Sequence, residues 1–61
     1  MNGEWTFANL QGEWVYESYC TKEDAIQVAK SIFEGSFLVG QLNGDDEELE
    51  YTVENIKEID Q

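Results

Sequence analysis

Apolar residues recur at spacings of three and four along residues 21–35, which is the spacing of one face of an α-helix. Thr21 precedes this run as a helix N-cap, and Asp24 follows three positions later in the manner of a capping box. Gly35 closes the run and suits the left-handed C′ position after a helix. The pattern predicts a helix over residues 21–35, with a buried stripe made of Ala25, Val28, Ala29, Ile32 and Phe33.

The chain before this helix alternates apolar and polar residues in a way that predicts two short strands joined by a turn at residues 10–12. Trp5 and Phe7 alternate with polar neighbours in the first strand. In the second strand Trp14 and Tyr19 fall on opposite faces, so aromatic side chains occupy both sides.

The chain after the helix predicts an apolar strand over SFLVGQL, residues 36–42, and an alternating strand over ELEYTVE, residues 48–54. The dipeptide Asn43-Gly44 between them is typical of a tight hairpin turn. A two-residue turn at this dipeptide would place apolar residues of the first strand opposite acids of the second, which requires that face to be exposed. A longer loop would change the register, and both alternatives stay open.

The last residues of the chain, 55–61, continue either as a helical turn or as a strand that passes through a bulge, because Val53, Ile56 and Ile59 are spaced by three. Together the elements predict a single small α+β domain over residues 1–61, of order ββαββ, with one helix packed on an antiparallel sheet. A chain of 61 residues is near the lower size limit for a stable core, so we expect a homodimer or a bound partner to add stability.

The composition is strongly acidic, with 14 Asp and Glu residues, three lysines, no arginine and a formal net charge of −11. Such a charge repels nucleic-acid phosphates and anionic membrane surfaces, so we expect no direct binding to either. Hydrophobic residues make up 41% of the chain, which is too many for a disordered acidic tail. The apolar runs are too short for a membrane helix, and the first residues lack the pattern of a signal peptide, so the sequence predicts a cytoplasmic protein.

Residues that could carry catalysis are scarce. Histidine and arginine are absent, and no glycine-rich phosphate loop is present, so we expect no enzyme activity, no catalytic residue and no cofactor. The single cysteine, Cys20, has no histidine to activate it, and we expect it to be a small buried side chain that touches Ala25 just before the helix.

A calcium loop is the one metal motif to consider. If Asn43 is its first position, then Asp45 is the third, Glu47 is the fifth and Glu54 is the twelfth, all of which are ligand positions. The sixth position must be glycine for the chain to turn, but here it is Glu48. We therefore predict no specific metal site.

Five carboxylates crowd the six positions from Asp45 to Glu50. They can be the solvated face of a strand and its turn, or an acidic surface that imitates nucleic-acid phosphates and docks on a basic protein. The many aromatic residues favour an interface, because Trp and Tyr are typical anchors of protein contacts. The predicted contact residues are Asp45, Asp46, Glu47 and Glu48 for charge, with Trp5, Trp14 and Tyr16 as anchors.

Residues 14–42 resemble short, acidic, uncharacterised proteins of phages and prophages of Bacillus-type bacteria. The matching features are a strand that ends in aromatic and acidic residues, a helix start of the form T-K-E-[DE]-A-I, and the motif F-x-V-G. The resemblance implies a non-enzymatic inhibitor of a host protein, such as an anti-phage defence or DNA-acting protein, that works as a dimer by occlusion or DNA mimicry. It transfers no functional residue. The alternative is a small structural or adaptor domain whose charge serves solubility only.

Overall fold

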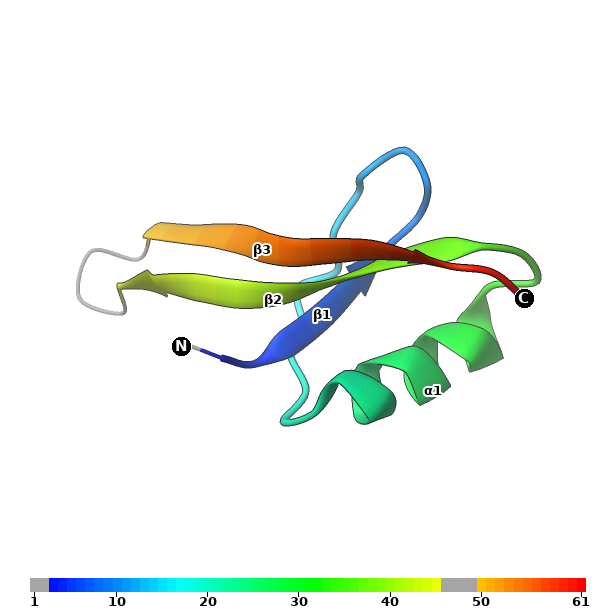
Figure 1. Ribbon diagram of the computed structural model, residues 1–61, viewed down its shortest axis with the longest axis horizontal. Helices are drawn as coiled ribbons and strands as arrows, with labels where there is room; N and C mark the ends of the chain where they lie inside the picture. The colour runs from blue at the N-terminus through cyan, green and yellow to red at the C-terminus, as the bar shows by residue number, and fades with distance from the viewer. Residues whose placement is uncertain (1–2, 46–49) are drawn as a thin grey trace.

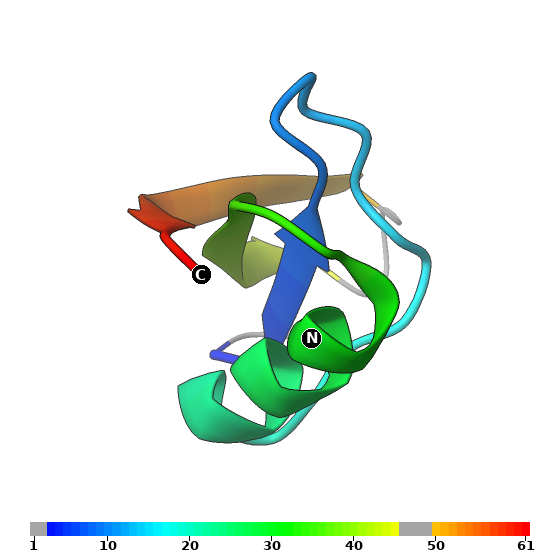
Figure 2. The ribbon, with the colours of Figure 1, turned by 90° about the vertical axis from the view of Figure 1, so that its right-hand side faces the viewer.

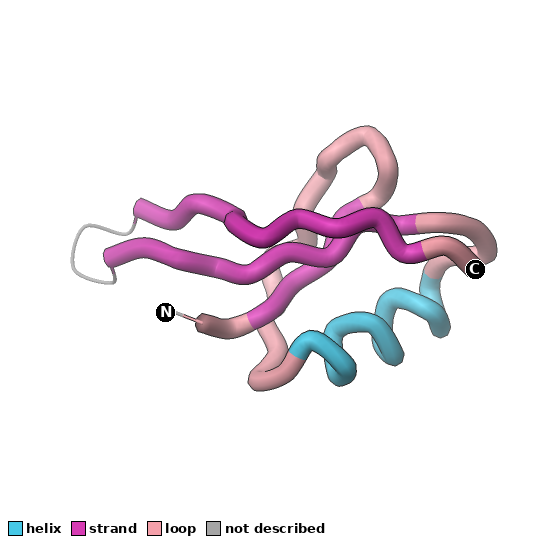
Figure 3. The backbone as a smooth tube through the Cα atoms, viewed as in Figure 1, coloured by secondary structure: helices cyan, strands magenta, loops and turns pink. Residues whose placement is uncertain are grey.

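A computed structural model describes residues 3–45 and 50–61 of the chain. Within these residues three strands form one antiparallel sheet of order β1-β2-β3, and a helix packs on one of its faces (Figure 1). The tube in Figure 3 shows that the β2–β3 hairpin is the longest part of the molecule. This arrangement confirms the α+β class with one helix on an antiparallel sheet. The bounds are β1 Trp5–Ala8, α1 Lys22–Ile32, β2 Phe37–Asp45 and β3 Glu50–Ile59.

The start of α1 is confirmed, whereas its predicted end is wrong. The Thr21 side chain caps the helix by accepting a hydrogen bond of 3.1 Å from the backbone N–H of Asp24. At the other end Phe33 leaves the helix in an extended conformation, while its N–H still donates to the Ala29 carbonyl at 2.8 Å. Gly35 therefore does not provide a left-handed C′ residue. Among the described residues no helix is long and apolar enough to cross a membrane.

The early exit of Phe33 from the helix places its ring in the core. The Phe33 ring lies edge-on to the Phe7 ring, with 5.8 Å between the ring centres, and stacks on the Phe37 ring, with 5.7 Å between the centres. The Phe7 ring also stacks on the Tyr19 ring, with 6.0 Å between the centres. These rings link the helix exit, the sheet and the chain before the helix. Geometries of this kind add to the stabilisation that burial alone provides.

The helix approaches the sheet closely because Ala25 and Ala29 on its buried face are small and fully buried. They pack against Phe7, Phe37 and Val39, which form the centre of the core. Ile32, which the spacing predicted to be buried, is 60% exposed because the helix ends at this residue. Cys20 is also exposed, so the predicted buried contact with Ala25 is wrong.

The β2–β3 hairpin has the longer of the two predicted connections. Asn43 pairs with Thr52 and Gly44 pairs with Tyr51, so the Asn-Gly dipeptide lies inside β2 and makes no tight turn. A Cβ added at Gly44 would overlap the Glu50 carbonyl oxygen and would lie 2.8 Å from Cα of Tyr51, so glycine is needed here because the backbone of β3 approaches closely.

The tail continues as a strand through a bulge, which was one of the two predicted alternatives. Val39 pairs with Lys57 but Gln41 pairs with Glu54, so two residues of β3, Asn55 and Ile56, lie opposite the single residue Gly40. Asn55 has a left-handed φ of 54°, a conformation that asparagine tolerates better than most residues. Its side-chain amide donates to Oε1 of Gln41 at 2.9 Å.

The predicted second strand is present only as two isolated bridges to the outer edge of β1, Ala8 with Trp14 and Trp5 with Tyr19. The N–H of Val15 donates to the Phe7 carbonyl at 3.1 Å, and Tyr19 exchanges two hydrogen bonds of 2.8 Å with Trp5. Between these two contacts β1 has one residue, Thr6, whereas the segment that connects β1 to α1 has three residues, 16–18. These three residues must arch away from β1, which interrupts the strand. Figure 2 shows this connection rising from β1 and returning beside it to the helix.

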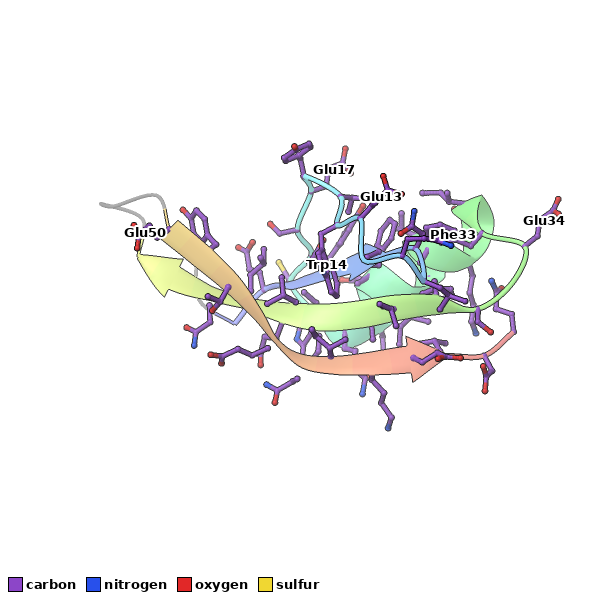
Figure 4. The ribbon with its side chains drawn as sticks, turned by 90° about the horizontal axis from the view of Figure 1, so that it is seen from above. Glu13, Trp14, Glu17, Phe33, Glu34 and Glu50 are labelled. Atoms are coloured by element: carbon purple, nitrogen blue, oxygen red, sulfur yellow. The ribbon has the colours of Figure 1, made fainter. Side chains whose placement is uncertain are left out.

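The second face of the sheet is covered by Trp14. Its ring lies over Gly40, where an added Cβ would come within 3.0 Å of Trp14 Cη2 and would overlap Val53 Cγ1. Figure 4 shows Trp14 reaching from the connection toward β2. Thr6 and Ala8 are buried on this side of β1. The small sheet is therefore covered by α1 on one face and in part by one aromatic ring on the other.

The contact at Gly40 gives a direct stability test. Gly40→Ala should lower the free energy of unfolding by about 1–3 kcal/mol, because the new methyl group overpacks the Trp14–Val53 contact. Gly35→Ala is the matched control, since an added Cβ at Gly35 meets no atom within 4 Å. This control should leave the free energy of unfolding unchanged or raise it by up to about 1 kcal/mol, because alanine lowers the conformational entropy of the unfolded chain. Urea unfolding measures both, and equal effects of the two substitutions would contradict the proposed packing of Trp14.

Candidate functional site

A groove with a volume of about 350 Å³ lies beside Trp14. It is built from two parts of the chain, the connection before α1 and the β2–β3 hairpin. Leu42 of β2 lies on the strand face opposite Val39, which contacts the helix side of the core, so the groove lies on the sheet face away from α1. The lining residues are Trp14, Val15, Tyr16, Glu17, Ser18, Leu42 and Tyr51.

The wall of the groove is the arch of residues 16–18, and the buried Thr6 side chain holds it to β1. The Thr6 hydroxyl lies 2.9 Å from the Glu17 carbonyl, to which it donates, and 3.5 Å from the Val15 carbonyl. The Ser18 hydroxyl donates to the Glu4 carboxylate. A side-chain hydroxyl thus fills the space in which a regular pair of strands would place backbone hydrogen bonds. Tyr16 is the first residue of this arch and is fully exposed.

The floor of the groove comes from the hairpin. Leu42 is half-buried, and Tyr51 is 43% exposed. Tyr51 pairs with Gly44 across the two strands, and both its backbone and its ring lie close to the position that a Gly44 side chain would occupy. Together with Trp14 and Tyr16, Tyr51 brings three aromatic side chains to one groove.

Glu17 gives the groove its charge. Its Oε2 accepts a hydrogen bond of 3.0 Å from the Tyr19 hydroxyl, whereas Oε1 has no partner among the described residues. Burial raises the pKa of the Tyr19 hydroxyl, and the adjacent Glu17 carboxylate raises it further because its negative charge disfavours the phenolate. Tyr19 therefore keeps its proton at neutral pH and donates to Glu17.

The lysines lie away from the groove. Lys22 and Lys30 belong to α1, on the other side of the sheet. Lys57 belongs to β3 and pairs with Val39 of β2. None of the three lines the groove. The carboxylate of Glu17 is consequently not neutralised by a lysine of the groove lining, and the groove is an apolar, aromatic surface with a negative charge.

The structure brings together two of the three predicted anchors. Trp14 and Tyr16 both line the groove, whereas Trp5 packs against the core beneath α1. The ammonium group of Lys22 lies 5.9 Å from the centre of the Trp5 ring, which is a cation–π distance. Trp5 is thus on the opposite side of the sheet from the other two anchors.

The predicted acidic residues are placed only in part. Asp45 is the last residue of β2 and pairs with Glu50, while Asp46, Glu47 and Glu48 lie outside the described residues. Figure 4 shows Glu50 at the hairpin end and Glu13 and Glu17 on the connection.

Three of the positions considered for a calcium loop, Asn43, Asp45 and Glu54, lie in two paired strands, and Glu47 and Glu48 lie outside the described residues. Asn43 in β2 donates through its side-chain amide to Glu54 in β3, at 3.0 Å. The two residues therefore face each other across a hairpin and do not surround an ion. Within the described residues no three potential ligands are grouped for a metal.

Sequence reasoning did not identify the groove residues Leu42 and Tyr51 as a site. A sequence pattern gives the face of a strand on which a residue lies but not the segment that crosses this face. Two glycines of β2 are the signal that could have found them, because side chains approach Gly40 closely and the backbone of β3 approaches Gly44 closely. Such glycines mark a close approach of another group to a strand.

Comparison of the chain with protein-family models, with curated proteins and with solved structures found no match. The geometry of the groove is therefore the basis for any functional conclusion.

The Thr6 hydroxyl offers a test of how the arch is held. Thr6→Val should lower the free energy of unfolding by about 1 kcal/mol, since it removes a buried hydrogen bond without changing the size of the side chain. The backbone N–H groups of Val15 and Tyr19 should exchange faster with solvent. Thr52→Val is the control, because the Thr52 hydroxyl donates to the Asn43 carbonyl at an exposed site. Thr52→Val should lower the free energy of unfolding by less than about 0.5 kcal/mol. Equal decreases for the two variants would show that the Thr6 hydroxyl has no special role in holding the arch.

Proposed function

We propose that this chain is a non-enzymatic binding protein that attaches to a basic surface of a host protein and inhibits it. The observation that supports this most directly is the groove: its lining includes three aromatic residues and one acidic residue, and no lysine. In a chain with a net charge of −11, such a surface fits a partner that is both basic and partly apolar.

The exposure of Tyr16 supports a role in contact with another molecule. Phe7, Phe33 and Phe37 pack against one another between the helix and the sheet, so the core explains them. The core does not explain Tyr16, which is fully exposed on an arch that Thr6 holds. An exposed tyrosine on a fixed backbone is a suitable interface anchor, because little conformational entropy is lost when it binds.

The net charge supports association with a basic partner. Acidic residues outnumber lysines by 14 to three, and four of them follow one another in the sequence from Asp45 to Glu48. A field of this sign accelerates encounter with basic proteins and makes binding sensitive to salt. Inhibition would follow by occlusion, in line with the resemblance to acidic phage proteins.

A purely structural or adaptor domain is the alternative. In that case the charge serves solubility and the groove has no partner. The two proposals differ in whether substitutions in the groove change the capture of another protein, which gives the following experiment.

Tyr16 and Ile32 form a matched pair for a capture experiment. Both are large, exposed apolar residues, but Tyr16 lines the groove and Ile32 is on α1. Immobilised protein should retain a basic protein from a Bacillus-type lysate at low salt, and Tyr16→Ala should weaken this binding at least about ten-fold. Ile32→Ala should bind like the unchanged chain. The retained protein should lose its own activity when the chain is added in solution.

Equal retention by the Tyr16→Ala and Ile32→Ala variants, or by an unrelated acidic protein of the same charge, would contradict the proposed function. The structural domain would then be the better account.

The acidic run is tested by neutralisation. Replacing Asp46, Glu47 and Glu48 by their amides should slow association with the captured protein and reduce the salt dependence of its affinity. The control makes the same change in overall charge at Glu23, Glu34 and Glu58, which are exposed and lie outside the groove lining. Surface plasmon resonance at several salt concentrations measures both variants. Identical salt dependence of the two variants would show that only the net charge matters.

A further inference from the structure

We propose that the groove accepts an arginine side chain of the basic partner, which contacts the aromatic rings of Trp14, Tyr16 and Tyr51 and pairs with the Glu17 carboxylate. This inference rests on the proposed function and specifies the chemical group that the groove recognises.

The first support is the kind of residue that lines the groove. Trp and Tyr rings attract cations through the negative charge density on their faces, and grooves with several such rings recognise cationic groups. Here Trp14 and Tyr16 come from the connection before α1, and Tyr51 comes from β3. The fold thus brings three rings together from two distant parts of the chain.

The second support is the distribution of cations within the molecule. On the helix side, the ring of Trp5 already has a cation, because the Lys22 ammonium lies 5.9 Å from its centre. No lysine lines the groove on the other side. The lining of the groove therefore supplies no lysine to the rings of Trp14 and Tyr16.

The third support is the carboxylate of Glu17. Its Oε2 is held by the Tyr19 hydroxyl at 3.0 Å, which restricts the side chain, while Oε1 has no partner within the described part of the chain. A charged donor that enters the groove can therefore pair with Oε1 without breaking an existing hydrogen bond. Charge-assisted hydrogen bonds of this kind are stronger than neutral ones.

Arginine fits this surface better than lysine. A guanidinium group is planar and stacks on aromatic rings. It is also more weakly hydrated than an ammonium group, so it loses less hydration free energy when it enters an apolar groove. The groove volume of about 350 Å³ is near the lower end of the range for small-ligand sites, which suits a side chain and its immediate neighbours.

Four short peptides test the inference, Gly-Xaa-Gly-Xaa-Gly with Xaa as arginine, lysine, citrulline or leucine. Citrulline keeps the shape of arginine without its charge, and leucine represents an apolar occupant. Titrations of the isotope-labelled protein at low salt are followed by NMR at the indole N–H of Trp14. The Trp5 indole is the internal control, because it lies on the other side of the sheet, and a Trp5→Phe variant assigns the two signals.

The arginine peptide should shift the Trp14 signal much more than the Trp5 signal, and it should bind more tightly than the lysine peptide. The citrulline and leucine peptides should bind at least about ten-fold more weakly than the arginine peptide. Tyr16→Leu keeps an apolar side chain but removes the ring, and should weaken arginine binding about two- to five-fold. Glu17→Gln should also weaken it, whereas Glu23→Gln on α1 should leave it unchanged.

Three outcomes would overturn the inference. Citrulline or leucine binding as tight as arginine binding would show that the groove does not select a cation, and the proposed protein-binding function would still stand. Equal shifts at Trp5 and Trp14, unaffected by Tyr16→Leu, would show diffuse attraction by the net charge. Absence of any change at Trp14 would exclude a cation in the groove. The proposed function itself fails separately, through unchanged protein capture by the Tyr16→Ala variant.

Discussion

The contact of the Trp14 ring with the bare backbone of Gly40 is the constraint on which the second half of the fold depends. Because Gly40 has no side chain, the ring can extend from the edge of β1 across to Val53 of β3. This contact fixes one end of the connection before α1, while the bridge between Trp5 and Tyr19 fixes the other. The arch between them has its shape because both ends are held, and the groove has its wall for the same reason.

The two faces of the sheet divide the aromatic residues by role. On the helix side, Phe7, Phe33 and Phe37 pack around the small residues of α1 and provide most of the core. On the other side only part of the sheet is covered, and the uncovered part is the groove in which Tyr16 is exposed. A small domain can present aromatic groups in this way without losing its core, because the two sets of rings share no face of the sheet. The helix lysines also stay apart from the groove, which leaves Glu17 to set its charge.

Local sequence signals predicted the helix start, the turn after β1 and the class of the fold, since capping and alternation act over a few neighbouring residues. They did not predict the arch, because its cause is a mismatch in residue number between two segments that pair across the Asn9–Gly12 turn. They left a tight turn and a longer loop both open at Asn43-Gly44, because this dipeptide has the preferred turn sequence. In the structure it lies inside β2, and Gly44 allows the backbone of β3 to approach closely. Trp14 and Tyr16, two of the three anchors predicted from residue type, line the same groove. Their grouping with Tyr51, and the separation of Trp5 from them, depend on contacts between distant segments.

The most direct test of this account is a two-dimensional NOE spectrum of the free protein in solution. The Trp14 ring protons should show NOEs to the α-protons of Gly40 and to a γ-methyl group of Val53, and the Gly40 α-protons should be shifted by the ring current of the indole. NOEs between the rings of Phe33 and Phe7 report independently that the helix side of the core is folded. If these core NOEs are present and the Trp14 contacts are absent, then Trp14 does not hold the connection against the sheet, and the arch and groove described above do not exist in solution.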